Sequence, residues 1–130
     1  MVRIEWKKCN RGALPLLYAI SRWQVPKAVS RQYLEMIGKV SEWVKQNRKK
    51  CYFEYSTYSL LKTEDLSTET WMNIDAYKDQ ETYEEFTKVF KKSNPEYALL
   101  FKIEEEIHSI IVPNSIIYEI CIEKPELRID

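Results

Sequence analysis

The chain has 130 residues, 45% of them hydrophobic, and its 20 basic and 20 acidic side chains give a formal net charge of zero. This length suits one domain with a hydrophobic core. The sequence lacks the run of about 18 apolar residues that a membrane helix needs, and it lacks a hydrophobic signal segment. We therefore expect a cytoplasmic, single-domain protein with an N-terminal arm (1–12), a core (13–123) and a C-terminal tail (124–130).

Charge is unevenly distributed along the chain. Residues 1–50 carry 12 basic and 3 acidic side chains, a net charge of +9, and residues 51–130 carry 8 and 17, a net charge of −9. A basic half can bind nucleic acid or an anionic membrane, or it can pack against an acidic half of the same molecule. We favour internal packing, because the predicted basic helix (27–50) and acidic helical region (79–106) are expected to lie side by side.

The first predicted strand spans 14–24 and contains Pro15, which a strand tolerates near its beginning. A helix is predicted to follow from Pro26, because the first residue of a helix needs no N–H donor, and to end near Asn47. The apolar residues of this helix recur at intervals of three and four, as one buried stripe requires; they are Val29, Tyr33, Met36, Ile37, Val40, Trp43 and Val44.

Two strands are predicted next, at 51–62 and 68–77, joined by a polar turn at 63–67 to form a hairpin. Because successive side chains of a strand point to opposite faces, the segment 68–77 has one apolar face and one polar, aromatic face. The apolar face, which we expect to turn towards the helices, consists of Met72, Ile74 and Ala76. The polar, aromatic face consists of Trp71, Asn73, Asp75 and Tyr77.

After Tyr77 the apolar period changes from two to three or four residues, which predicts a helix to about Lys92. A second helical segment is predicted from Asn94, a good N-cap followed by a proline, and the last strand is predicted at 116–123. The resulting order, β-α-β-β-α-β, is that of an α+β, ferredoxin-like fold. In that fold one antiparallel sheet carries its helices on one face.

The sheet face that the helices leave open is predicted to be both aromatic and acidic. So many aromatic residues indicate a contact surface, whereas unpaired carboxylates are costly in an ordinary dry core. The residues predicted there are Tyr52, Glu54, Ser56, Tyr58, Trp71, Asn73, Asp75, Tyr77, Ile117, Glu119 and Cys121. Those predicted to face the helices are Phe53, Met72, Ile74, Ile116 and Ile120. The open face then either binds nucleic acid or packs against a second copy of the chain around a cavity.

Nucleic-acid binding is the less favoured of these two interpretations. RNA-recognition domains share this topology and stack bases on aromatic side chains, a role open to Trp71 and Tyr77. The third strand, however, lacks the basic-glycine-aromatic signature of those domains, and Glu54, Asp75 and Glu119 would repel phosphates. We therefore expect no nucleic-acid partner.

Segments 71–77, 81–86, 94–97 and 111–115 carry a resemblance to a known superfamily. Together they make the span from about 14 to 123 resemble the dimeric α/β-barrel superfamily, which includes antibiotic-biosynthesis-type monooxygenases and NIPSNAP-like proteins. The resemblance implies a homodimer in which two open sheets pack face to face. It also implies a pocket for a small hydrophobic or aromatic ligand, between sheet and helices or at the barrel mouth. Some members use no cofactor, and none is expected here.

The candidate catalytic residues are Glu54, Asp75 and Glu119, because a carboxylate in a closed cavity can have a raised pKa and act as a general base. These acids can instead pair with Arg22, with tyrosine hydroxyls or across a dimer interface. The candidate ligand-binding residues are Tyr18, Arg22, Tyr52, Tyr58, Trp71 and Asn73. Interface packing is the other interpretation of the aromatic residues among them.

No metal site is predicted. The single histidine, His108, is expected on the surface near the end of the second helical segment, so neither a multi-histidine metal site nor a Ser-His-Asp set can be argued from spacing. The cysteines have no CxxC spacing and are expected to be buried or half-buried thiols; they are Cys9, Cys51 and Cys121.

Two classes of function stay open. One is a homodimeric enzyme acting on a small hydrophobic or aromatic molecule, such as a cofactor-free monooxygenase, cyclase or isomerase. The other is a non-catalytic dimeric ligand-binding or structural protein. Haem degradation is less favoured: the superfamily members that degrade haem use an Asn, a Trp and a His, and Asn10 and Trp71 are the candidates for the first two. A cavity of some hundreds of Å³ would favour the enzyme, and a filled lumen the alternative.

Overall fold

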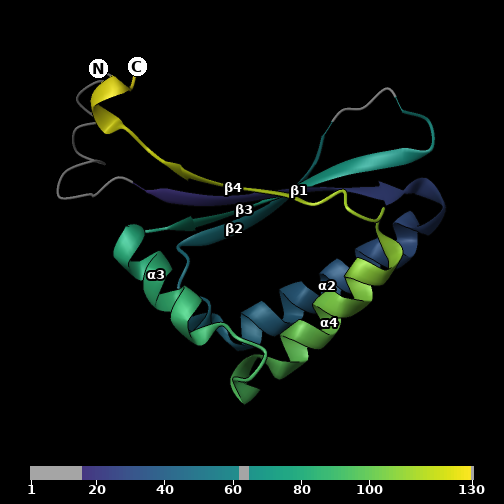
Figure 1. Ribbon diagram of the computed structural model, residues 1–130, viewed down its shortest axis with the longest axis horizontal. Helices are drawn as coiled ribbons and strands as arrows, with labels where there is room; N and C mark the ends of the chain where they lie inside the picture. The colour runs from purple at the N-terminus through teal and green to yellow at the C-terminus, as the bar shows by residue number, and fades with distance from the viewer. Residues whose placement is uncertain (1–15, 62–64, 130) are drawn as a thin grey trace.

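The computed structural model describes residues 16–61 and 65–129 and confirms the ferredoxin-like fold (Figure 1). Four antiparallel strands form one sheet in the order β2-β3-β1-β4; they are β1 (Leu17–Pro26), β2 (Tyr55–Leu61), β3 (Thr68–Tyr77) and β4 (Ile117–Ile122). Three helices lie on one side of this sheet; they are α2 (Ser30–Gln46), α3 (Gln80–Val89) and α4 (Ala98–Ile110). The predicted arm at 1–12 lies outside the described residues. Within these residues, every helix is too short or too polar to span a membrane.

Local sequence signals account for most helix boundaries. Asp79 caps α3, because its carboxylate accepts a hydrogen bond of 2.8 Å from the backbone N–H of Thr82. Asn94 caps the short 3-10 turn before α4 in the same way, accepting from the N–H of Glu96 at 3.0 Å. Pro26, by contrast, ends β1, and a 3-10 turn separates it from α2, so the predicted start of that helix was three to four residues early.

The second strand is shorter than predicted. It begins at Tyr55 and not at Cys51. Tyr52 has a φ of 67°, a left-handed conformation that a continuing strand does not adopt. Cys51 is buried at this turn, and the ring of Tyr52 packs on that of Phe86 with centroids 5.6 Å apart. Burial of these side chains therefore turns the chain before β2 starts.

The predicted orientation of β2 and β3 is wrong, whereas that of β4 is confirmed. Residues directly opposite each other on paired strands share a face, and β1 turns its buried residues Leu17 and Trp23 towards the helices. Leu17 pairs with Tyr77 and Trp23 with Trp71, so the aromatic face of β3 is the inner one. The outer face is formed instead by Tyr18, Ile20, Arg22, Tyr55, Thr57, Met72, Ile74, Ala76, Ile117, Glu119 and Cys121. Large aromatic rings bury more apolar area than Met or Ile, which favours this arrangement.

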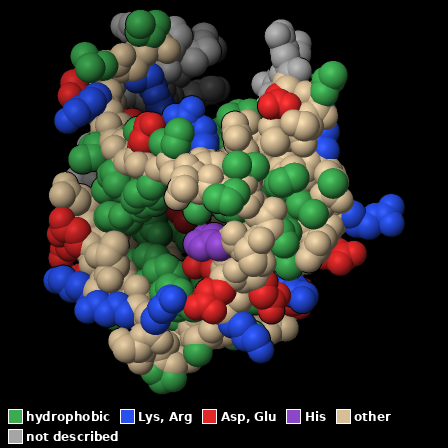
Figure 2. Space-filling model, turned by 45° about the vertical axis from the view of Figure 1, so that its right-hand side comes forward, with side chains coloured by type: hydrophobic (Ala, Val, Ile, Leu, Met, Phe, Trp, Pro, Cys, Tyr) green, Lys and Arg blue, Asp and Glu red, His purple; other side chains and the backbone are tan. Residues whose placement is uncertain are grey.

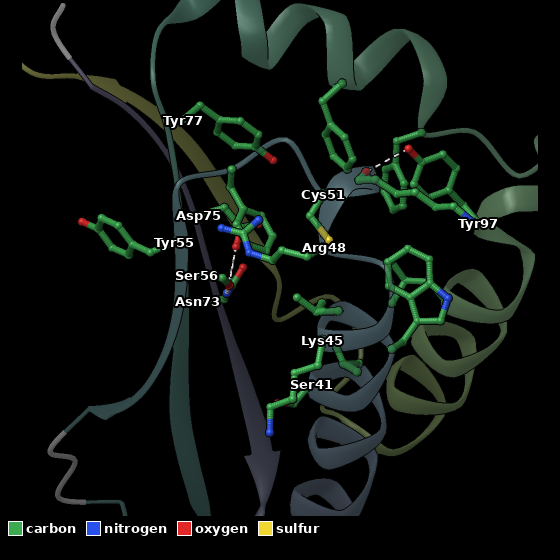
Figure 3. A pocket seen from close by; sticks show the side chains of 18 of the residues that line it. Ser41, Lys45, Arg48, Cys51, Tyr55, Ser56, Asn73, Asp75, Tyr77 and Tyr97 are labelled. Carbon is green, nitrogen blue, oxygen red and sulfur yellow. Dashed lines mark hydrogen bonds between the residues drawn. The ribbon is translucent and has the colours of Figure 1, made fainter. Parts of the chain in front are cut away.

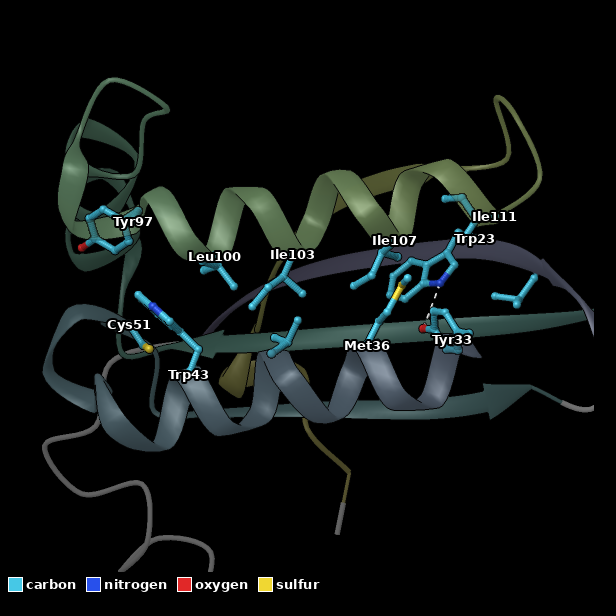
Figure 4. Close-up of a cluster of buried hydrophobic side chains, with 12 residues drawn as sticks. Trp23, Tyr33, Met36, Trp43, Cys51, Tyr97, Leu100, Ile103, Ile107 and Ile111 are labelled. Carbon is cyan, nitrogen blue, oxygen red and sulfur yellow. Dashed lines mark hydrogen bonds between the residues drawn. The ribbon is translucent and has the colours of Figure 1, made fainter. Parts of the chain in front are cut away.

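The main core lies between the antiparallel helices α2 and α4 and the sheet (Figure 4). It consists of Trp23, Val25, Tyr33, Met36, Val40, Trp43, Cys51, Tyr97, Leu100, Ile103, Ile107 and Ile111. The indole N–H of Trp23 donates a buried hydrogen bond of 3.0 Å to the hydroxyl of Tyr33, which fixes β1 to α2. A smaller cluster of Leu17, Ala19 and Tyr77 packs beneath α3.

Basic α2 and acidic α4 lie side by side, as the charge distribution predicted (Figure 4). Lys39 Nζ of α2 lies 4.0 Å from a carboxylate oxygen of Glu106 on α4. Within the acidic half, Lys92 pairs with Glu105 at 3.0 Å. Both pairs are exposed, so each contributes little to stability. The contact between Lys39 and Glu106 nevertheless brings unlike charges of the two halves together.

Candidate functional site

A cavity of about 510 Å³ lies between the inner face of the sheet and the helices (Figure 3). Figure 1 shows why: α3 diverges from the α2–α4 pair, so the middle of β2 and β3 is not covered closely. The sequence places short polar side chains at the middle of these strands. Towards the two ends of β3, by contrast, the large rings of Trp71 and Tyr77 fill the space. The apolar part of the wall consists of Val40, Trp43, Val44, Phe53, Phe86, Phe90, Tyr97 and Leu100.

A hydrogen-bonded triad of Ser56, Asn73 and Asp75 lies on the sheet side of this cavity (Figure 3). The Ser56 hydroxyl donates to Asp75 Oδ1 at 2.5 Å. The Asn73 side-chain amide donates to Ser56 Oγ at 3.1 Å, to the carbonyl oxygen of Thr57 at 3.0 Å and to Asp75 Oδ1 at 3.3 Å. Burial raises the pKa of Asp75, and the hydrogen bonds from Ser56 and Asn73 only partly oppose this shift. The triad thus fixes a carboxyl group whose affinity for a proton is increased.

A second carboxyl group, Glu104 on α4, lines the cavity from the opposite wall. Burial, and secondarily the charge of Asp75, raises its pKa to about 7. A carboxyl group with a pKa near 7 can both accept and return a proton at neutral pH. Glu104 therefore adds a proton-exchanging group to the cavity.

Two tyrosine hydroxyls complete the polar lining. Burial, followed by the charge of Asp75, raises the pKa of Tyr58 and of Tyr77 above the usual value for a phenol. Both side chains therefore stay protonated at neutral pH and can donate a hydrogen bond to a bound molecule. Tyr77 is almost completely buried and is packed edge-on against Tyr83, so its position is fixed.

A second cavity of about 230 Å³ adjoins the first. The two share four lining residues: Val40, Tyr58, Asn73 and Glu104. His108 lines the second cavity, and Figure 2 shows the histidine, in purple, beside a hollow of the surface. The exposed position predicted for His108 is confirmed, but its place at this cavity was not foreseen.

Four of the predicted site residues line the large cavity: Glu54, Tyr58, Asn73 and Asp75. Of these, Tyr58, Asn73 and Asp75 reach it from the inner sheet face and not, as predicted, from the open one. The open face therefore lacks the aromatic platform on which the nucleic-acid interpretation depended. Trp71 instead packs on Tyr33 with ring centroids 5.3 Å apart, and its buried indole N–H has no hydrogen-bond partner among residues 16–61 and 65–129.

The other predicted residues lie away from the cavity. On the outer sheet face Arg22 Nη2 lies 3.1 Å from Glu119 Oε1, which matches the pairing considered as the alternative for this acid. Tyr18, also on that face, donates a hydrogen bond of 3.2 Å to Glu123. Burial and the charge of Glu123 raise the pKa of Tyr18 to about 12. Tyr52 packs on Phe86, beside the turn into β2.

Sequence reasoning missed Glu104, although the sequence contains a signal for it. Glu104 follows Leu100 by four residues and precedes Ile107 by three, so it occupies the buried stripe of α4. A carboxylate on an apolar stripe is unusual and indicates a functional position. The cationic residues Lys45 and Arg48, which belong to the predicted basic helix (27–50), also line the cavity.

The cysteine and metal predictions have different outcomes. Cys51 is buried, and this burial raises the pKa of its thiol. Cys121 is exposed on the outer face, contrary to prediction, because β4 is an edge strand. Cys9 lies outside the described residues. In ranges 16–61 and 65–129, no group of three or more His, Cys, Asp or Glu side chains is arranged to hold a metal ion.

Comparison with known proteins finds this fold at low sequence identity. No family model matches the sequence, and no curated protein matches it. A dimeric ferredoxin-like protein from an uncultured marine organism has a TM-score of 0.61 and 9% identity, over 85% of this chain and 96% of that one. SnoaB, a cofactor-independent oxygenase from Streptomyces nogalater, has a TM-score of 0.54 and 8% identity, over 82% and 90%.

A third similar structure contains a bound ligand. The monooxygenase ActVA-Orf6 of Streptomyces coelicolor, in complex with the ligand Nanaomycin D, has a TM-score of 0.52 and 15% identity, over 83% of this chain and 87% of that one. Identities this low show a common fold and do not transfer an activity. The shared fold is that of dimeric ferredoxin-like proteins and antibiotic-biosynthesis monooxygenases.

Proposed function

We propose, from the premise that this chain has the fold of the dimeric α/β-barrel superfamily, that it is a cofactor-independent enzyme acting on a small aromatic molecule. The observation that carries the proposal is the position of Asp75. Its carboxyl group is half-buried, held by Ser56 and Asn73, and lines an aromatic cavity (Figure 3). A carboxylate in such a place is suited to act as a general base.

The size and lining of the cavity support a small aromatic ligand. Binding sites for small molecules commonly measure about 300–1,000 Å³ and combine apolar walls with a few oriented polar groups. The volume of about 510 Å³ is within this range. Rings from α3 and the following turn, Phe86 and Phe90, stack with centroids 4.9 Å apart and offer a flat wall to a planar ligand.

The proposed reaction begins with proton removal from a phenol. Asp75 accepts the phenolic proton, and the resulting electron-rich phenolate reacts with dioxygen at a ring carbon that carries hydrogen. One oxygen atom becomes a new carbonyl and the other leaves as water, so the phenol and O₂ give a quinone and H₂O. The substrate itself supplies the electrons. Glu104, whose pKa is about 7, accepts or returns protons during these steps, and Tyr58 and Tyr77 hold the developing oxyanion by hydrogen bonds.

The outer sheet face supports a homodimer. Its centre carries Ile20, Met72, Ile74 and Ile117, an apolar patch that the described helices leave uncovered. Similar structures include dimeric ferredoxin-like proteins. We infer that two copies pack these faces together, with the Arg22–Glu119 pair at the periphery of the contact.

The proposed function is tested by oxygen consumption. Hydroxylated naphthalenes and anthracenes are offered to the wild-type protein and to Asp75→Asn, with dioxygen followed at an electrode and quinone by absorbance. We expect turnover in the wild type and a loss of about 100-fold or more in the variant, since general base catalysis contributes about 10²–10⁴-fold. Glu119→Gln, on the outer face, is the matched control and should keep its activity.

The result also separates the enzyme from the non-catalytic alternative. Saturable binding of the aromatic compounds without oxygen uptake would assign the chain to the ligand-binding class. If none of the compounds binds, the cavity is not a ligand site and the proposal is wrong.

A further inference from the structure

We propose that the molecule bound in the large cavity is an aromatic acid, whose carboxylate or similar anionic group is held by Arg48 and Lys45. This inference deepens the proposed function and rests on the same cavity. It does not depend on catalysis, because it concerns how the cavity selects its ligand.

Both cations come from the C-terminal end of α2. Lys45 lies in its last turn, and Arg48 begins the 3-10 turn Arg48–Lys50 that follows. Both side chains line the cavity, as does Lys50 of the same turn. In Figure 3 Lys45 lies along α2, whereas the Arg48 side chain extends from the end of α2 towards the sheet. A ligand whose ring packs among the aromatic walls would therefore meet positive charges that this segment supplies.

The guanidinium group of Arg48 is already positioned. Its carbon lies 4.6 Å from the centroid of the Phe53 ring, and Nη2 donates a hydrogen bond of 2.8 Å to the backbone carbonyl oxygen of Glu54. A guanidinium group has five N–H donors, so this arrangement leaves donors for a bidentate contact with a carboxylate. Little side-chain entropy remains to be lost when an anion binds.

The positive charges are not neutralised by the described protein. In ranges 16–61 and 65–129, the ion pairs involve neither Lys45 nor Arg48. Three acids line the same cavity: Glu54, Asp75 and Glu104. Of these, Glu54 is beside Arg48, but the contact is made by its backbone carbonyl.

The described cations and acids of the cavity do not form ion pairs with each other. Within the part of the chain that the structure describes, neither Arg48 nor Lys45 pairs with Asp75 or Glu104. Burial raises the pKa of both carboxyl groups. The cavity therefore offers cations to an anionic group and two carboxyl groups to a proton-donating group such as a phenol. A ring carrying both a hydroxyl and an acidic substituent matches this combination.

Basic residues also occur at helix C-termini simply because they suit the helix dipole. Lys49 supplies an internal comparison for this explanation. It belongs to the same short turn as Arg48 but does not line the cavity. If the helix dipole alone explained why cations occur here, replacing Lys49 and replacing Arg48 would change ligand affinity equally.

The experiment compares two fluorescent probes that differ by a single charged group. The probes are 8-anilinonaphthalene-1-sulfonate, which is anionic, and N-phenyl-1-naphthylamine, which has the same rings without the sulfonate. Both are titrated into the wild-type protein, Arg48→Gln, Lys45→Gln and the control Lys49→Gln. We expect Arg48→Gln to lower the affinity for the anionic probe about tenfold, because a charge-assisted bidentate contact is lost. The affinity for the neutral probe should change less than about twofold.

A further variant establishes where the probes bind. Ser41 lines the cavity from the exposed side of α2, so Ser41→Trp narrows the space without altering the core. Both probes should bind this variant more weakly. A hydroxynaphthoic acid should displace the anionic probe from the wild type more effectively than the corresponding naphthol.

The outcomes distinguish this inference from the proposed function. Equal binding of the two probes, or equal effects of Arg48→Gln and Lys49→Gln, would overturn the preference for an acid and leave the aromatic cavity standing. Binding of both probes that Ser41→Trp does not alter would place them elsewhere, and this too would overturn the inference. Failure of the wild type to bind either probe would overturn both proposals.

Discussion

Glu104 is the residue whose environment departs most from that of an ordinary surface carboxylate. It occupies the buried stripe of α4, forms part of the wall between two cavities and faces the charge of Asp75. In the unfolded chain the same group is solvated and titrates near its usual pKa of 4.5. Folding therefore raises its pKa, and this difference makes stability depend on pH.

The sign of this dependence is definite. The folded state is favoured while Glu104 is protonated, so its contribution is complete below pH 4.5 and is lost as the pH rises through about 7. We predict that Glu104→Gln, which cannot ionise, is more stable than the wild type at pH 8 by about 1–2 kcal/mol, with solvent at the cavity reducing the full effect. Near pH 4 the two proteins should differ much less.

Urea unfolding at pH 5 and pH 8 measures this effect. The control is Glu105→Gln, one residue along the same helix, whose ion pair with Lys92 is exposed. A wild-type protein that gains stability between the two pH values relative to Glu104→Gln would contradict the prediction.

At the scale of elements, boundaries were easier to predict than orientations. The range predicted for β3, 68–77, matches the structure, because a polar turn precedes it and the hydrophobic period changes after it. Its orientation was not decidable from its own residues, since both faces carry large apolar side chains. Pairing with β1 decides it: Trp23 and Leu17 face the core, so Trp71 and Tyr77 must do so too.

The capping of α3 gives a test at this scale. Asp79 accepts a hydrogen bond from the N–H of Thr82, and this bond lowers the pKa of Asp79. We predict that Asp79→Ala lowers the free energy of unfolding by about 1 kcal/mol, whereas Asp79→Asn retains most of it. Thermal unfolding followed by circular dichroism checks this, and equal stability of Asp79→Ala and the wild type would refute it. Phe86 lies on α3 and Phe90 follows it directly, and both rings line the cavity. Ligand binding should therefore weaken in Asp79→Ala as well.

At the scale of the whole molecule, the topology followed from the sequence, whereas a pocket between sheet and helices was implied only by the family resemblance. The order of strands and helices determines the ferredoxin-like sheet. The cavity depends on how far α3 diverges from α2 and α4, a tertiary property that no local pattern encodes. Asp75, predicted as a candidate general base on the open face, lines this cavity from the inner face of the sheet.

The proposed dimer belongs to this scale and predicts a specific disruption. Ile74 lies at the centre of the outer face, opposite Ile20 and Thr57. We expect the wild type to sediment as a dimer and Ile74→Asp as a folded monomer, because an unpaired charge in an apolar contact is costly. The control is Leu34→Asp, which introduces the same charge at an exposed position of α2. A wild type that sediments as a monomer at micromolar concentration, or an Ile74→Asp dimer, would be incompatible with this contact.

The alternation of side chains along β3 has a consequence for how such a protein can diversify. Its odd-numbered positions from Trp71 to Tyr77 face the helices, and its even-numbered positions from Met72 to Ala76 face outward. Under the proposed function and the proposed dimer, neighbouring codons thus specify two separate properties, the choice of substrate and the choice of partner. A library randomised at alternate positions could change either property while leaving the other as it was inherited.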